Sequence, residues 1–123
     1  MSKFLITIVG PTAIGKTSLA IKLAKKYKTE VISADSRQFY RELNIGTAKP
    51  SKDELSSVKH HLINNISVTD KYDISHFESD ARKIIDNLFK TKDYVILVGG
   101  SGLYIDTILS VSYTHLRAHE TLR

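Results

Sequence analysis

The sequence contains no cysteine and no apolar stretch long enough to cross a lipid bilayer. The absence of cysteine excludes disulfide bonds and thiolate metal sites, which fits the reducing cytoplasm. A membrane-spanning helix needs roughly 20 apolar residues, so we expect no membrane association. Residues 4–9 are too short for the core of a signal peptide, and a glycine-rich turn follows them. We therefore expect a cytoplasmic chain, and its 123 residues leave room for one domain.

The chain has a net charge of +5, from 18 basic and 13 acidic residues. Such an excess is compatible with a polyanionic partner. Much of it comes from Lys22, Lys25, Lys26 and Lys28, which fall on the outer face of one expected helix. A solvated helix face explains those lysines equally well, so charge alone does not identify a partner.

Three short runs rich in β-branched residues, at 4–9, 31–34 and 94–98, predict buried strands. A helix is expected over 15–27, so strand, helix and strand form a βαβ unit whose strands are parallel. The expected fold class is α/β, a P-loop NTPase-like parallel sheet flanked by helices and truncated to three strands. Such a sheet would leave a long apolar edge unpaired.

The helices are predicted from apolar periodicity and from capping signals. In the helix over 15–27, Leu19, Leu23 and Tyr27 recur every four residues with Ala20 and Ala24 beside them, and these five residues predict the buried face. Ser75 and Glu78 have the spacing of a capping box, which predicts a helix from there to about Lys90. A short helix over 53–58 and another from about residue 103 complete the expected set.

The last dozen residues, 112–123, interrupt this pattern. They continue no apolar stripe, and they resemble a peptide encoded by sequencing-adapter read-through. We therefore expect residues 1–111 to form a partial P-loop domain from a longer protein, and residues 112–123 to be a non-native tail. His115 and His119 have the spacing of metal ligands on a helix, but we assign no metal site to such a tail.

A complete phosphate-binding motif follows the first expected strand and opens the first expected helix. It consists of Gly10, Pro11, Thr12, Ala13, Ile14, Gly15, Lys16 and Thr17. The glycines allow successive backbone N–H groups to face phosphate oxygens, and the helix N-terminus adds its positive dipole end. Lys16 supplies a full charge, and the Thr17 hydroxyl is a candidate ligand for Mg²⁺. The motif predicts chemistry on a phosphorylated or pyrophosphorylated substrate.

The second expected strand ends at Asp35, and the third ends in a glycine-rich turn over 99–102. The carboxyl ends of parallel strands share one crevice, so Asp35 is expected beside the phosphate motif. A carboxylate there is suited to accepting a proton from an attacking nucleophile. The alternatives are that Asp35 caps a helix or organises Mg²⁺ through water. In the turn, the Ser101 hydroxyl is a candidate hydrogen-bonding group for a planar base, or the turn simply connects strand and helix.

Five stretches in this order resemble the N-terminal part of the bacterial tRNA dimethylallyltransferase family. They lie at residues 10–17, 32–40, 45–50, 60–62 and 98–104, and the resemblance covers about residues 3–110. It implies transfer of a dimethylallyl group from dimethylallyl diphosphate to N6 of the adenine that follows the tRNA anticodon. The expected partners are thus tRNA and dimethylallyl diphosphate, and the expected cofactor is Mg²⁺. We expect the protein to be a monomer.

The resemblance also implies roles for individual residues. Asp35 takes the proton from the N6 amine, Lys16 acts with it in catalysis, and Thr12 and Thr17 contact the diphosphate. The tRNA-binding residues implied are Asp35, Ser36, Arg37, Gln38 and Ser101. Arg37, Lys59 and Ser101 replace the methionine, proline and threonine that are usual in the family, and we expect both His60 and His61 to be structural.

Three other functions fit parts of the sequence. A small-molecule kinase would hold ATP in the motif, but the strand over 94–98 lacks the carboxylate that such enzymes usually place at its end. An adenylate isopentenyltransferase would share the chemistry but use free AMP, and a nucleotide-binding module would lack catalysis. Because family members are much longer, we expect the 123-residue chain itself to be inactive or nearly so.

Overall fold

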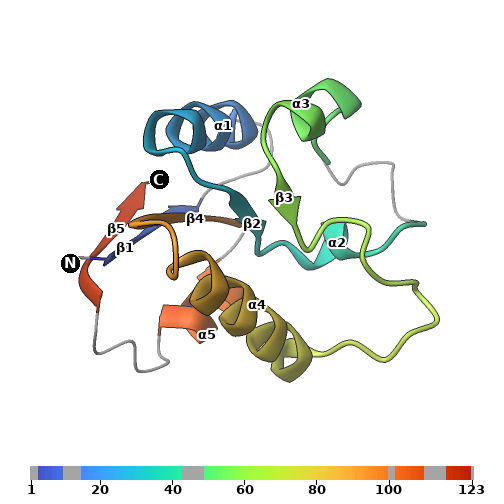
Figure 1. Ribbon diagram of the computed structural model, residues 1–123. Coiled ribbons are helices and arrows are strands. Elements are labelled where there is room, and N and C mark those ends of the chain that lie inside the picture. Colours follow the sequence, from blue (N-terminus) through green and yellow to red (C-terminus); the bar gives the residue numbers. More distant parts are fainter. Residues whose placement is uncertain (1–2, 10–14, 43–48, 100–101, 110–115, 123) are drawn as a thin grey trace.

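The computed structural model describes residues 3–9, 15–42, 49–99, 102–109 and 116–122, which form a layered α/β domain (Figure 1). Its centre is a five-stranded sheet in which every paired strand is parallel. The strand order is β3-β2-β4-β1-β5. The strands are β1 (Lys3–Val9), β2 (Val31–Ser33), β3 (His60–His61), β4 (Tyr94–Gly99) and β5 (Leu116–Leu122).

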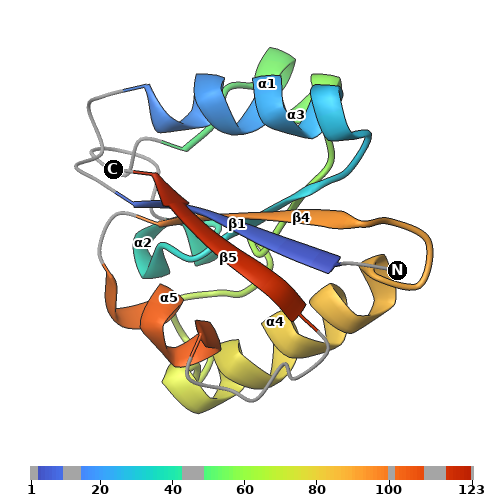
Figure 2. The same ribbon diagram turned by 90° about the vertical axis from the view of Figure 1, so that its left-hand side faces the viewer.

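Helices cover both faces of this sheet, as Figure 2 shows. Helices α1 (Lys16–Tyr27) and α3 (Lys52–Ser57) lie on one face, and α4 (Ile74–Leu88) and α5 (Gly102–Leu109) lie on the other. The short helix α2 (Ser36–Phe39) follows β2 directly. This arrangement confirms the predicted fold class, a P-loop NTPase-like parallel sheet flanked by helices. Among the described helices, none is long and apolar enough to cross a membrane.

Strand β4 lies between β1 and β2 and brings their carboxyl ends together. Its Ile96 is in register with Ile6 of β1 and with Val31 of β2. The backbone N–H of Ala34 donates to the Val98 carbonyl at 2.6 Å, which continues the pairing past the end of β2. The carboxyl ends of β1, β2 and β4, with Asp35 directly after β2, therefore meet at one edge of the sheet.

Two apolar clusters hold the layers together. Under α4 and α5, Phe39 stacks on Phe77 with ring centroids 5.5 Å apart, and Tyr104 meets Phe77 edge to face at 5.0 Å. Under α1, Ala20 and Ala24 pack against apolar strand residues that include Ile6, Ile8, Val31 and Ile96. The second cluster uses small helical side chains, so α1 lies close to the sheet and to the phosphate site at its N-terminus.

The buried face of α1 confirms part of the prediction. Ala20 and Ala24 are buried as expected, whereas Leu19 is 37% exposed. Leu23 and Tyr27 are only partly buried and flank the contact. Alanine has no bulk to hold the helix away from the sheet, so the two alanines form the centre of the contact and the larger residues predicted with them lie beside it.

The start of α4 also differs from the prediction. The capping residue is Asp73, whose side chain accepts from the His76 backbone N–H, while the His76 ring accepts from the Asp73 N–H. The helix therefore begins at Ile74, before the predicted Ser75 cap, and ends at Leu88. Its predicted stripe is confirmed, since Phe77, Ala81, Ile85 and Leu88 are all buried.

Strands β3 and β5 were not predicted. Strand β3 has only two residues, too few for a periodic signal. Strand β5 consists of residues expected to lie in a non-native tail, and it pairs with β1 from Lys3 to Ile8. The predicted open edge is therefore not β1, because β5 pairs with it and the edge strands of the described sheet are β3 and β5. This pairing does not test whether residues 112–123 are native.

Candidate active site

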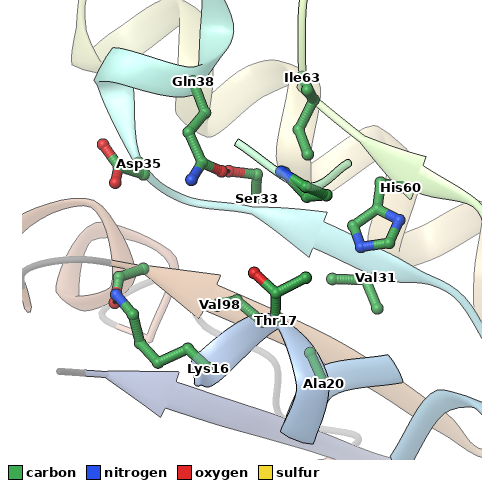
Figure 3. A pocket seen from close by; sticks show the side chains of 12 residues that line it. Lys16, Thr17, Ala20, Val31, Ser33, Asp35, Gln38, His60, Ile63 and Val98 are labelled. Atoms are coloured by element: carbon green, nitrogen blue, oxygen red, sulfur yellow. Dashed lines mark hydrogen bonds between the residues drawn. The ribbon is translucent and has the colours of Figure 1, made fainter. Parts of the chain in front are cut away.

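A pocket opens where α1 begins and where β2 and β4 end (Figure 3). Residues of helices, strands and loops line it. They are Lys16, Thr17, Ala20, Val31, Ser33, Asp35, Gln38, Pro50, His60, Ile63, Val98 and Gly99. Four residues that the sequence predicted for the site are therefore brought together: Lys16, Thr17, Asp35 and Gln38.

Lys16 is the first residue of α1, and its side chain turns toward the end of β4. Its ammonium group donates to the Gly99 carbonyl at 2.8 Å, and the residue is only 8% exposed. Lysine is rarely buried to this degree unless its charge is compensated. An ammonium has three N–H donors, so the bond to Gly99 is compatible with a further bond to a phosphate oxygen.

Gly15 sets the direction in which Lys16 and Thr17 enter the pocket. It precedes α1 with a φ of 73°, in the left-handed region that favours glycine. Its carbonyl accepts the first turn's hydrogen bond from Leu19 at 3.1 Å. The helix can therefore start at Lys16, which places the Thr17 hydroxyl on the pocket wall.

Asp35 lies between the end of β2 and the start of α2 and is 8% exposed. Its carbonyl accepts from the Gln38 N–H at 2.9 Å, which forms the first turn of α2. The pocket is therefore lined by a buried carboxylate and a buried ammonium, both near strand ends. This placement suits proton acceptance by Asp35, and the adjoining helix leaves the capping alternative open.

A hydrogen bond between Ser33 and Gln38 orders the wall next to Asp35. The Ser33 hydroxyl donates to the side-chain carbonyl oxygen of Gln38 at 2.9 Å. Accepting this bond fixes which end of the Gln38 amide is oxygen, so its NH₂ group is turned away from Ser33. A planar amide held in this way can read the edge of a nucleobase.

Gly99 is a site residue that was expected only to belong to a flexible turn. A Cβ atom here would lie 3.1 Å from the Ala34 carbonyl oxygen and 2.9 Å from Ile105 Cδ1. The missing side chain therefore allows the end of β4 to approach the backbone that carries Asp35. The same residue accepts the Lys16 hydrogen bond, so it positions both charged groups.

The two neighbouring histidines behave differently. His61 contacts Glu30 at 2.6 Å, and neither residue lines this pocket, in agreement with a structural role. His60 lines the pocket, a position that was not predicted. Its ring Nδ1 lies 2.8 Å from the Val58 carbonyl, and burial lowers its pKa below the usual value. Pro50 and Ile63 lie outside helices and strands and His60 lies in the two-residue strand β3, so local sequence did not predict that they line the pocket.

Several predicted residues lie outside this description. Gly10, Pro11, Thr12, Ala13, Ile14 and Ser101 are not among the described residues. The backbones of Ser36 and Arg37 form the start of α2, but their side chains are not described. Their contacts with diphosphate or tRNA stay predictions.

A parallel sheet between helical layers, with the phosphate motif leading into α1, defines a P-loop α/β protein. The sequence profile of the family described as IPP transferase matches residues 38–123. The chain belongs to this family.

Known members are similar in sequence and structure. The tRNA dimethylallyltransferase of Flavobacterium johnsoniae is 57% identical over 107 residues, which are 87% of this chain and 35% of that protein. The protein of the same name from Christiangramia forsetii is 56% identical over 108 residues, which are 88% of this chain and 36% of that protein. This chain therefore spans about a third of these curated relatives.

Solved structures of similar proteins share this fold. The tRNA isopentenylpyrophosphate transferase of Bacillus halodurans superposes with a TM-score of 0.80 at 41% identity, over 88% of this chain and 35% of that one. A eukaryotic dimethylallyltransferase described as acting on tRNA also gives a TM-score of 0.80, at 35% identity, over 86% of this chain and 26% of that one.

Proposed function

We propose that this chain supplies the diphosphate-binding and proton-accepting part of an enzyme that transfers a dimethylallyl group to tRNA. The observation that carries the proposal is the burial of Lys16 and Asp35, each 8% exposed, in the wall of one pocket. Membership in the IPP transferase family supports the reaction class. The similarity to tRNA dimethylallyltransferases supports the dimethylallyl group and tRNA.

The proposed reaction is a displacement at the first carbon of dimethylallyl diphosphate. The N6 nitrogen of the adenine after the anticodon forms a bond to that carbon, and the bond from carbon to diphosphate oxygen breaks. Pyrophosphate leaves with the electron pair, and the Asp35 carboxylate accepts the proton lost by N6. Negative charge grows on the leaving diphosphate, where the Lys16 ammonium and the N–H groups at the start of α1 stabilise it.

The residues present also fit Mg²⁺. Among the described residues, no group of three histidine, cysteine or acidic side chains could enclose a metal ion. Mg²⁺ does not need such a cage, because it is usually held by one or two protein groups together with substrate phosphates and waters. Thr17 would hold the ion, and the bound ion would neutralise diphosphate charge.

For tRNA, the proposal places the target adenine beside α2. The base must leave its stack to reach a pocket, as in other enzymes that modify bases. Gln38 lines the pocket with an oriented amide. Further tRNA contacts are proposed for Ser36, Arg37 and Ser101 from the family resemblance. Asp35 then faces both the adenine and the diphosphate, as the reaction requires.

The residue at the end of β4 argues against the alternative function of a kinase. The strand closes at Gly99, without the carboxylate that ATP-dependent P-loop enzymes usually place there. The Gly99 carbonyl engages the Lys16 ammonium instead.

The test uses a chimera in which residues 1–110 of this chain replace the matching part of the Flavobacterium johnsoniae relative. With tRNA present, we expect pyrophosphate release from dimethylallyl diphosphate and no phosphate release from ATP. Phosphate release from ATP, with no prenylated tRNA, would contradict the proposal. The unmodified relative serves as the positive control.

A further inference from the structure

His60 carries a buried acceptor atom that nothing in the described part of the chain satisfies. Its ring enters the pocket from β3, while Thr17 enters from α1 (Figure 3). Ring atom Nε2 is buried and has no hydrogen-bond partner among the described residues. Most buried polar atoms in proteins do have a partner, so an unpaired one at a pocket wall calls for a ligand or a bound water.

The other ring nitrogen fixes the chemical character of Nε2. The Val58 carbonyl, 2.8 Å from Nδ1, can only accept a hydrogen bond, so Nδ1 carries the proton. Burial of the ring lowers the pKa of His60, which favours the neutral form. In a neutral ring protonated at Nδ1, Nε2 has a lone pair and no hydrogen. The missing partner must therefore be a hydrogen-bond donor.

A water molecule can be this donor. The volume of the ligand-free cavity is about 30 Å³. This is room for about one or two water molecules. Water also needs at least two polar neighbours, and the cavity wall offers Thr17 and Ser33 in addition to His60.

We propose that His60 is a positioning residue, whose Nε2 accepts a hydrogen bond from an ordered water that in turn accepts one from the Thr17 hydroxyl. In this chain of bonds the Thr17 proton points toward the water, which leaves the lone pairs of the hydroxyl oxygen for a ligand on the phosphate side. His60 thus orients Thr17 without touching the substrate. The inference rests on the proposed function, because it gives Thr17 a place in the diphosphate and Mg²⁺ site.

The ligand-free chain tests the water directly. Histidine ¹⁵N resonances should show His60 as the neutral ring protonated at Nδ1, and the His60→Gln variant identifies its signals. A crystal structure should show a water about 3 Å from Nε2 and from the Thr17 hydroxyl oxygen. A ring protonated at Nε2, or a dry cavity, would overturn the inference whatever the fate of the proposed function.

Binding of inorganic pyrophosphate with MgCl₂ tests the consequence for Thr17. His60→Leu removes the acceptor and should weaken binding about three- to tenfold, the usual effect of one hydrogen bond. His60→Gln retains an acceptor in a similar place and should recover most of the affinity. His61→Gln is the matched control and should bind like the parent.

The outcomes separate the two claims. Equal affinity of the parent and His60→Leu, with both folded by circular dichroism, would refute the positioning role while leaving the phosphate site intact. If the parent fails to bind magnesium pyrophosphate, the phosphate site of the proposed function is refuted. The water and the ring tautomer are then still decided by the ligand-free measurements.

Discussion

Gly99 is expected to tolerate no side chain, because it lies against the backbone that carries Asp35. In the Gly99→Ala variant the new Cβ would lie 2.9 Å from Ile105 Cδ1 and 3.1 Å from the Ala34 carbonyl oxygen. The Ile105 methyl group ends a flexible side chain and can move. The Ala34 carbonyl cannot move as easily, because the Ala34 N–H is bonded to Val98 at 2.6 Å.

From these contacts we expect Gly99→Ala to lower the free energy of unfolding by about 2 kcal/mol, within the usual range for overpacking. Urea denaturation followed by circular dichroism measures this change. Adding Ile105→Val removes the closest methyl group, so the double variant should be more stable than the sum of the two single changes predicts. The remaining loss reports the contact with the Ala34 backbone.

Gly15→Ala is the matched control, since it adds the same methyl group where nothing lies within 4 Å. Its φ of 73° still makes alanine unfavourable, by about 1 kcal/mol. Gly99→Ala should therefore be the more destabilising of the two, and it should also weaken pyrophosphate binding through Ala34 and Lys16. A loss below about 0.5 kcal/mol, the level of ordinary surface substitutions, would refute the close-approach argument.

Three further predictions follow from the pocket. Lys16→Ala should abolish detectable binding of magnesium pyrophosphate in calorimetry. Lys22 is exposed, so Lys22→Ala should bind like the parent. Equal binding by both variants would show that Lys16 is not a phosphate ligand. Burial lowers the pKa of His60 in the folded chain, although the Val58 hydrogen bond and Glu54 act to raise it. At acidic pH the unfolded chain therefore binds more protons than the folded chain. Stability should fall as the pH drops below the unfolded pKa of about 6.5. Urea midpoints between pH 7.5 and 5.5 should fall less for His60→Gln than for the parent, and parallel profiles would contradict that assignment. Finally, the 123-residue chain incubated with tRNA and dimethylallyl diphosphate should give little or no modified adenine, and efficient modification would show that the missing two-thirds of the relatives is dispensable.

The central sheet was predictable because its three main strands are apolar runs that are followed by glycine or aspartate. Val95, Ile96 and Leu97 are fully buried, as a continuous apolar run in a parallel sheet predicts. The most buried residues of α1 were harder to predict, because helical periodicity favours burial of Leu19 and of Ala20 equally. Only the distance between helix and sheet decides that the alanine is buried.

The positions of Lys16 and Asp35 could be predicted from the sequence. Asp35 directly follows β2, and Lys16 begins the helix that follows β1, so the topology alone brings them together. His60 comes from a two-residue edge strand and Pro50 from a loop, and neither position follows from local sequence. Gly99 was recognised as part of a turn, but its contact with Ala34 depends on tertiary packing.

The most direct test of the account is the rate of dimethylallyl transfer in the chimera with and without the Asp35 carboxylate. Asp35→Asn keeps the shape of the side chain but cannot accept the N6 proton, so single-turnover transfer should slow by about 10²- to 10⁴-fold. Pyrophosphate binding should stay unchanged, and the exposed Asp53→Asn should react like the parent. A rate for Asp35→Asn within about threefold of the parent would contradict the proposed role of Asp35 and with it the central claim.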